Sequence, residues 1–585
     1  MLTVLMYVVG SDLESESGHF TRNLRQMLSV QKPDTVNLVL QTGGTRVWQN
    51  DCMQDGQTQR FERTADGLRC LETMEAQNTG DAQTLRDFLV WGVTTYPAER
   101  YLLLFWNHGG GAIAGFGADE QFGQDALDLA ELQSAMQYAQ AQTHRTFEWV
   151  GFDACLMASI ETAQAVKGTA HYLIASQALE AADGWDYEAL LHKLYAEPSQ
   201  EAAAMGRMIA DTYAAAGDAQ RTLSVIDLEK IDAVADALDA LSSVLSEYLA
   251  EDPATRIYTL CGAAGKAMFY GGGTEEEGFS DMMDLGDLTR RWQACVPTHV
   301  SALCDALDTA VTYQATGSAH VQASGMSVYF PLRDQAKLAQ ARAFYERGPT
   351  PEAYRRLVLQ SIDAIEAAQS APRTPRFTEP IWLDEAGWCR TRLDPTRLSQ
   401  MHHVFFTLAA PYQEQTMLLL GEDQNLQVDP TTGEVREGFD CKWPAIDGHF
   451  VAPRLLTQTP QAVTYAIPAL LDGQQVSIRA AFVWDDDMSG HYELQGAWPG
   501  IDANTHMPAR DCVPLTPGSV LTPIYPLLNV QTGEKRWTAG VSFALTEAVM
   551  AEKELISGTY ALRFGVCDAL FQYEYTDFLT WNFAE

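Results

Sequence analysis

The sequence predicts an α/β protein, in which an α/β/α sandwich with a mostly parallel sheet is followed by a β-rich C-terminal domain. Up to about residue 330, short apolar runs alternate with helical patterns, and most of these runs are continuously apolar. Strands that are buried on both faces have this character, and helices between them imply parallel pairing. Beyond about residue 376, turn signals separate short strand patterns, which favours antiparallel strands.

The elements of the first domain follow from these runs. Strands are expected at residues 3–9, 36–41, 101–106, 147–152, 172–176, 222–226 and 326–330. Helices are expected at residues 130–142, 159–166 and 233–249. In the first helix, Leu132, Met136 and Ala139 recur at the spacing of one helix face. The alternation of strands and helices predicts three layers.

Residues 369–376 contain two prolines among small and polar residues and are expected to form a linker. The linker divides the chain into residues 1–370, which form the α/β/α domain with helical additions, and residues 371–585, which form the β-rich domain. Strands of the second domain are expected at residues 404–409, 463–467, 476–483, 492–494 and 559–566. This spacing fits either a sandwich or a barrel, and it leaves the role of the domain open.

The chain is strongly acidic. Its 585 residues include 39 Lys and Arg against 77 Asp and Glu, which gives a formal net charge of −38. Binding to phosphate backbones requires clustered Lys and Arg, so nucleic acid is not an expected partner. The charge favours cationic ligands instead. Composition leaves the oligomeric state open.

Cysteine usage and the N-terminus bear on the cellular compartment. The ten cysteines are scattered without a CxxC pair, which fits neither a disulfide framework nor a zinc cluster. The first ten residues lack the basic region and cleavage site of a secretion signal, and no apolar run approaches the roughly 18 residues of a membrane span. We therefore expect a cytoplasmic protein without a membrane span, or a secreted one if this N-terminus is that of a trimmed mature form.

Two strand ends carry reactive side chains. The apolar run 101–106 leads to His108 and a run of glycines, and the run 147–152 leads to Cys155. Ligands of open α/β sheets bind beyond the carboxyl ends of strands, so the two side chains are expected to share one crevice. An imidazole, or the helix expected just after Cys155, would increase the thiolate population. The backbone N–H groups of Gly109 and Cys155 are candidates for holding an oxyanion, and the reaction class implied is acyl transfer through a thioester.

Several motifs resemble those of the clostripain family of cysteine peptidases. They are YVVGSDLES at 7–15, QTGG at 41–44, WNHGGG at 106–111, GFDACLM at 151–157, GWDY at 184–187, DLGD at 284–287 and SGMSVYFP at 324–331. They cover residues 1–335 in the expected order. The resemblance implies a caspase-like domain with a His108/Cys155 dyad and cleavage after a basic P1 residue. It also implies that Asp153, and an acidic position matched by Asp183, bind the P1 side chain of a basic peptide or protein substrate.

The resemblance also raises two questions: whether the protein is activated by cleaving itself, and whether it requires a metal ion. Relatives often cleave themselves between the two catalytic residues, but this chain has no Lys or Arg from His108 through Thr143, and Arg145 is the first. Activation by such processing is therefore not expected. No cofactor is expected to be required, although some relatives need calcium. The acidic residues that could supply oxygen ligands, without the spacing of a defined loop, are Asp119, Glu120, Asp125 and Asp128.

Two alternatives remain beside the endopeptidase. One is a catalytically silent relative, in which the crevice binds a basic peptide and the second domain serves adhesion or assembly. The other, a serine hydrolase, lacks the G-x-S-x-G elbow. The glycine- and glutamate-rich run 271–278 is expected to be a mobile loop near the crevice.

Overall fold

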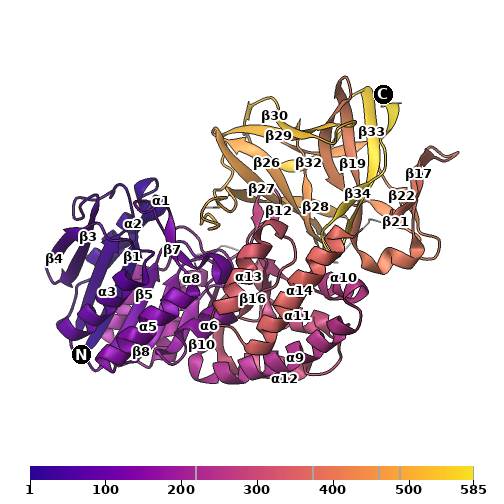
Figure 1. Ribbon diagram of the computed structural model, residues 1–585. Coiled ribbons are helices and arrows are strands. Elements are labelled where there is room, and N and C mark those ends of the chain that lie inside the picture. Colours follow the sequence, from indigo (N-terminus) through magenta and orange to yellow (C-terminus); the bar gives the residue numbers. More distant parts are fainter. Residues whose placement is uncertain are drawn as a thin grey trace.

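A computed structural model describes residues 1–215, 217, 220–371, 375–458, 462–485, 489–510 and 512–583. Figure 1 shows an N-terminal sheet with helices on both faces, a group of further helices, and a strand-rich C-terminal part that packs against those helices. The predicted fold class is therefore confirmed. In the described residues, no helix is both long enough and apolar enough to cross a membrane.

The main sheet has the strand order β15-β10-β9-β8-β5-β1-β2-β3-β4. Its centre is parallel: β1 pairs with β2 and β5, β5 pairs with β8, and β8 pairs with β9. The outer strands pair antiparallel to their neighbours. The bounds are β1 (Leu2–Val9), β2 (Val36–Gly43), β3 (Gln57–Thr64), β4 (Gly67–Glu75), β5 (Arg100–Trp106), β8 (Phe147–Asp153), β9 (Ala170–Ala175), β10 (Thr222–Asp227) and β15 (Val311–Thr316).

Helices cover both faces of this sheet, which explains the continuously apolar strands. In β1, Leu5 and Tyr7 pack into one core with Phe88, whereas Val4 and Met6 pack into the other. Every residue of β1 is buried for this reason. The first core includes α3 (Ala82–Thr95), α5 (Leu129–Thr143) and α6 (Ile160–Val166), and the second includes α2 (His19–Ser29), α7 (Tyr187–Ala196) and α8 (Ala202–Ala215).

The helical additions extend the first core. They are α9 (Ile231–Glu251), α10 (Pro253–Ala264), α11 (Leu285–Trp292), α12 (Val300–Ala310), α13 (Leu338–Arg347) and α14 (Glu352–Ser370). One expected strand lies elsewhere than predicted. Residues 326–330 contribute β16 (Ser327–Tyr329), which pairs antiparallel with β14 (Met282–Asp284) in a separate small sheet completed by β11 (Phe269–Tyr270). Its apolar residues are buried against the helical additions instead of in the main sheet.

The C-terminal part is made of antiparallel strands, as predicted. Helix α14 ends at Ser370 and β17 begins at Phe377, while residues 372–374 of the expected linker lie outside the described residues. The largest sheet has the order β28-β27-β26-β29-β20-β19-β33-β34. The bounds of its strands are β19 (Met401–Gln413), β20 (Thr416–Asp423), β26 (Ala462–Leu471), β27 (Gln474–Trp484), β28 (Gly490–Trp498), β29 (Val520–Asn529), β33 (Gly558–Asp568) and β34 (Tyr573–Tyr575).

Shorter strands complete this domain. Strands β25 (Arg454–Gln458), β30 (Lys535–Ala539), β31 (Phe543–Ala544) and β35 (Leu579–Phe583) pair at the margins of the largest sheet. The others form two small sheets: β17 (Phe377–Leu383), β18 (Cys389–Leu393), β21 (Leu426–Val428) and β22 (Glu434–Glu437), and then β23 (Lys442–Ile446), β24 (His449–Phe450) and β32 (Met550–Glu554). The long chain segment between β28 and β29 matters most for the site, because it reaches back to the first domain.

Candidate active site

His108 and Cys155 follow two neighbouring parallel strands. Trp106, at the end of β5, pairs with Asp153, at the end of β8. The two loops that leave these strands touch, since a Cβ atom on Gly109 would lie 2.2 Å from the carbonyl oxygen of Cys155. Only glycine fits this approach of the two backbones. The sheet therefore brings the two predicted residues to one edge.

The thiol of Cys155 is buried and held by a backbone donor. Its sulfur accepts a hydrogen bond from the amide of Glu180 at 3.1 Å. Burial raises the pKa of Cys155 to about 12, against the smaller opposing effects of Arg510 and the Glu180 amide. The expected helix N-terminus does not contribute, because α6 begins only at Ile160 and is capped by the side chain of Ser159. In this conformation the thiol is protonated and closed off from solvent.

Both ring nitrogens of His108 are engaged by groups other than the thiol. Nε2 lies 2.8 Å from Oδ1 of Asp12, and Nδ1 lies 3.2 Å from the carbonyl oxygen of Pro508. Burial alone would raise the pKa of Asp12, but the charge and hydrogen bond of His108 hold it well below its usual value. Asp12 thus orients the imidazole. Sequence reasoning did not give it this role, although it lies in the 7–15 motif.

The segment Gly184-Trp185-Asp186-Tyr187 is folded around Asp153. The hydroxyl of Tyr187 donates to Oδ2 of Asp153 at 2.7 Å, and the amide of Trp185 donates to the same oxygen at 3.3 Å. Gly184 has φ +66°, and a Cβ there would lie 2.6 Å from that oxygen. Asp186 caps α7, which fixes the position of Tyr187. These contacts explain why this motif accompanies an aspartate two positions before the cysteine.

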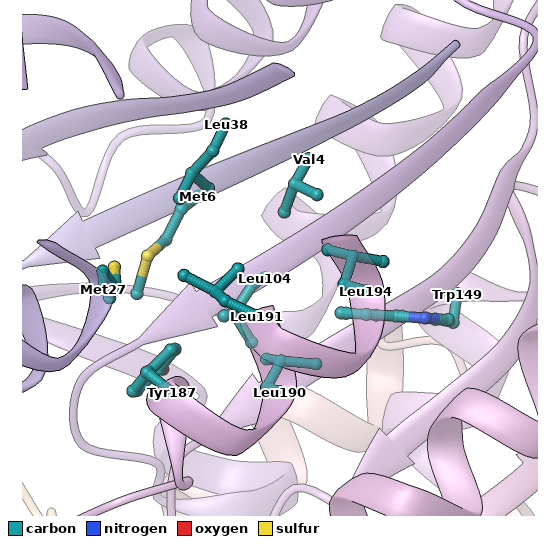
Figure 2. Close-up of a pocket in the computed structure, with 10 residues that line it drawn as sticks. All are labelled: Val4, Met6, Met27, Leu38, Leu104, Trp149, Tyr187, Leu190, Leu191 and Leu194. Carbon is teal, nitrogen blue, oxygen red and sulfur yellow. The ribbon is translucent and has the colours of Figure 1, made fainter. Parts of the chain in front are cut away.

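Tyr187, whose hydroxyl donates to Asp153, also lines an apolar pocket beside α7. Figure 2 shows this pocket. In the close-up, aliphatic side chains of the central strands and of α7 gather around this pocket. Its lining residues are Val4, Met6, Met27, Leu38, Leu104, Trp149, Tyr187, Leu190, Leu191 and Leu194. All belong to the second hydrophobic core. This pocket is therefore a packing feature behind the site, with no titratable group besides the Tyr187 phenol.

A second acid, Glu180, lies beside Asp153. Its side chain is fully buried, and Oε1 accepts from the indole N–H of Trp185 at 3.4 Å. Burial, and then the charge of Asp153, raise the pKa of Glu180 well above its usual value. We call Asp153 and Glu180 together the acid pocket.

The acid pocket contains an arginine from the β-rich domain. The guanidinium of Arg510 pairs with Oδ1 of Asp153, and it lies 3.4 Å from Oε2 of Glu180. It also donates to the carbonyl oxygens of Asp153 at 3.0 Å and Ala181 at 3.1 Å. Only 1% of the Arg510 side chain is exposed. Burial would lower the pKa of Arg510, but Asp153 and Glu180 raise it well above its usual value.

Asp183 does not enter the acid pocket. Its side chain is 62% exposed, and its two oxygens lie 2.9 and 3.0 Å from NH2 of Arg221. Glu180, three residues earlier, lies beside Asp153 in the acid pocket. Sequence reasoning missed Glu180 because it belongs to none of the matched motifs.

The four acids considered for calcium all bind donors of the chain itself. Asp119 accepts from Thr79 and Gln121, Glu120 pairs with Arg46 at 2.8 Å, Asp125 accepts from Asn78, and Asp128 caps α5. Among the residues that the structure describes, no group of three or more His, Cys, Asp or Glu side chains could hold a metal ion. The arrangement of these acids is that of caps and turns.

The backbone amides of Gly109 and Cys155 are the donors that the sequence predicts for an oxyanion. Within the described ranges, neither the amide of Gly109 nor that of Cys155 donates a hydrogen bond. The β-bridge between Gly109 and Phe116 is formed by hydrogen bonds of the residues on either side of them. The N–H of Gly109 itself takes no part in the bridge. A cysteine, a histidine and free amides at the carboxyl ends of adjacent parallel strands define the site of a cysteine hydrolase.

Comparison with known families places the chain more narrowly. The family model described as the clostripain family (peptidase C11) matches residues 6–349, which is more than half of the chain. The protein belongs to the clostripain family and is a cysteine peptidase of that family. The resemblance drawn from the sequence motifs is therefore confirmed. No curated protein matches the chain.

Solved structures with similar folds are also C11 proteases. A secreted C11 cysteine protease from Bacteroides thetaiotaomicron, in complex with an irreversible peptide inhibitor, is 20% identical, with a TM-score of 0.43 over 62% of this chain and 98% of that one. An inactive zymogen C11 protease from Parabacteroides distasonis is 22% identical, with a TM-score of 0.46 over 61% of this chain and 97% of that one. More than a third of this chain lies outside each alignment.

Proposed function

We propose that the protein is an endopeptidase that cleaves after Arg or Lys, with Cys155 as nucleophile and His108 as general acid. The observation that supports this most directly is the guanidinium of Arg510 in the acid pocket. The chain itself thus supplies an example of the side chain that this pocket accepts. A basic P1 side chain of a substrate would take the same place.

The electrostatics of the acid pocket favour a cation. Asp153 is fully buried, so its charge is compensated only by a positive group that enters the pocket. A guanidinium can bind both carboxyl groups and the two carbonyl oxygens at once, and an ammonium can bind as a compact charge. An acidic or neutral P1 side chain would leave Asp153 buried without a cationic partner. We therefore assign the second acidic position to Glu180 and not to Asp183.

The proposed reaction proceeds through a thioester. The Cys155 thiol gives its proton to His108, the resulting thiolate attacks the carbonyl carbon of the P1 residue, and the amides of Gly109 and Cys155 hold the oxyanion that forms. His108, oriented by Asp12, gives a proton to the leaving amine as the carbon–nitrogen bond breaks. Water then attacks the thioester, which releases the acid product and restores the thiol.

The test is a set of fluorogenic peptides with Arg, Lys, Asp or Asn at P1. These are assayed with the intact protein and with its Arg510→Gln variant, each with and without Cys155→Ala. We expect turnover of the Arg and Lys peptides only, and a loss of at least about 10³-fold on removing the sulfur. Equal turnover with and without Cys155 would refute the proposal, as would a preference for Asp or Asn.

A further inference from the structure

We propose that residues 507–510 of the β-rich domain, here called the plug, are an internal inhibitor that occupies the acid pocket and keeps the peptidase latent. This inference rests on the proposed function, because it treats the acid pocket as the binding site for the P1 side chain. It concerns a segment that lies outside the residues matched by the clostripain family model.

The plug belongs to a self-supporting hairpin between β28 and β29. Ile501 and Pro508 are bridged across the hairpin, and the side chain of Asp502 accepts from the amides of Asn504 and Thr505 at its tip. Trp498 donates its indole N–H to the carbonyl oxygen of Ala509 at 2.8 Å. The hairpin is thus fixed by its own domain, as a rigid inhibitory loop must be.

Arg510 is bound by the peptidase domain alone. All the polar contacts of its side chain in the described residues are with Asn107, Asp153, Glu180 and Ala181. A buried arginine that served its own domain would pair with an acid of that domain, as Arg376 does with Asp568 and Glu574. Arg510 therefore serves the contact between the two domains.

The plug also covers the histidine. The carbonyl oxygen of Pro508 accepts from Nδ1 of His108 at 3.2 Å, so this nitrogen is not available to a substrate. Met507 lies against the glycine run, because a Cβ on Gly110 would lie 2.9 Å from its sulfur. His108 is 5% exposed and Cys155 is fully buried. The plug thus fills the acid pocket and occupies one nitrogen of the general acid.

A second contact fastens the same face of the β-rich domain. The run 271–278 forms a hairpin of β12 (Gly273–Thr274) and β13 (Gly278–Phe279), and it is docked, in contrast to the mobile loop that was expected. Its buried Glu277 pairs with Arg479, and its Glu276 lies 3.5 Å from Arg454. The carbonyl oxygen of Glu277 accepts from the amide of Ile501 at 2.7 Å. This acidic hairpin therefore holds the base of the plug hairpin.

The proposal is tested by access to Cys155. The probe is a biotinylated peptide acyloxymethyl ketone with arginine at P1. It alkylates Cys155 only if the side chain of this P1 arginine enters the acid pocket. Labelling and turnover of an Arg peptide are compared for the full-length protein, Arg510→Ala, Arg510→Gln and Arg510→Lys. We expect both rates to rise about tenfold or more in the Ala and Gln variants. Arg510→Lys keeps a cation in the pocket and should stay latent.

Two further variants guard against misfolding and unspecific effects. Arg376→Ala removes a buried arginine with two acidic partners elsewhere in the same domain, and its labelling rate should equal that of the unaltered protein. Replacement of residues 502–510 by a Gly-Ser segment of equal length removes the plug while the rest of the chain stays. Circular dichroism and thermal unfolding check that each variant is folded.

The outcomes separate this inference from the proposed function. Equal labelling and equal turnover of the unaltered protein and the plug-free variants would overturn the inhibitor and leave the peptidase standing. Labelling that rises without turnover would support the plug and overturn the endopeptidase in favour of a silent, peptide-binding relative. The absence of labelling and turnover in every folded form would overturn both.

Discussion

The two domains contribute side chains of opposite charge to the site, and these side chains come from different kinds of segment. The peptidase domain builds the acid pocket from local segments: Asp153 ends a strand, and Glu180 and Gly184 lie in the loop that follows β9. The β-rich domain contributes one arginine on a long hairpin, 357 residues from its partner Asp153. The comparison teaches that the pocket is built from segments of one domain, whereas its occupant comes from the other domain. Three measurements would break or sharpen this distinction.

The largest expected effect is on the reactivity of Cys155. Its pKa is raised to about 12 in the plugged protein, so the thiolate fraction at pH 8 is very small. A solvated thiol has a pKa near 8.5, and removal of the plug should therefore speed alkylation by up to about 10³-fold at pH 8. The rate should rise steadily with pH up to pH 10 in the intact protein, and it should level off above about pH 9 in the variant in which a Gly-Ser segment replaces residues 502–510.

Iodoacetamide with peptide mapping of Cys155 measures these rates. The exposed Cys52 serves as an internal control, because its rate should be the same in both proteins. If the two pH profiles of Cys155 coincided, the plug would not be what buries the thiol. The distinction between a pocket built by one domain and an occupant supplied by the other would then not account for the reactivity of Cys155.

A smaller effect is expected from the acids, measured in the plug-free protein. Asp153→Asn should lower kcat/KM for an Arg peptide by about 10² to 10³, because it removes the charged partner of the guanidinium. Glu180→Gln should lower it by about tenfold or less, since the raised pKa of Glu180 favours the neutral form of its carboxyl group.

The matched control for these acids is Asp183→Asn. It removes an acid from the same loop, but one that is exposed and paired with Arg221, and we expect less than about a twofold change. A large loss for Asp183→Asn together with none for Glu180→Gln would return the second acidic position to Asp183.

The smallest effect concerns the shape of the pocket. Gly184→Ala places a Cβ 2.6 Å from Oδ2 of Asp153 at a positive φ, and we expect it to lower the free energy of unfolding by about 1–3 kcal/mol. Gly168→Ala has a similar φ of +78° but no neighbouring atom within 4 Å, so it measures the backbone strain alone. Denaturant unfolding of both variants gives the difference. Equal losses would mean that the approach to Asp153 contributes nothing.

Much of the local architecture could be predicted from the sequence. The apolar runs located the central strands, and the ends of two of them indicated His108 and Cys155 as candidates. Asp153 was also found, because it lies within a motif next to the cysteine. The strand at 326–330 was assigned to the wrong sheet, since a short apolar run does not say which partner covers it. The expected helix N-terminus at Cys155 was wrong because four residues, 156–159, separate Cys155 from the start of α6.

The sequence by itself determined the fold class, the family and the edge of the sheet that carries His108 and Cys155, because strand periodicity and motif spacing are local properties. Only the tertiary structure decided which acid faces the pocket, which carboxylate orients His108 and what fills the pocket. Glu180 and Asp183 are both acidic residues of one loop, and the sequence does not distinguish their roles. The fold of the loop turns Glu180 toward Asp153 and Asp183 toward Arg221. The position of Arg510 in the acid pocket depends on a contact between the two domains. Such a contact leaves no periodic pattern or motif spacing in the sequence, so sequence reasoning could not find it.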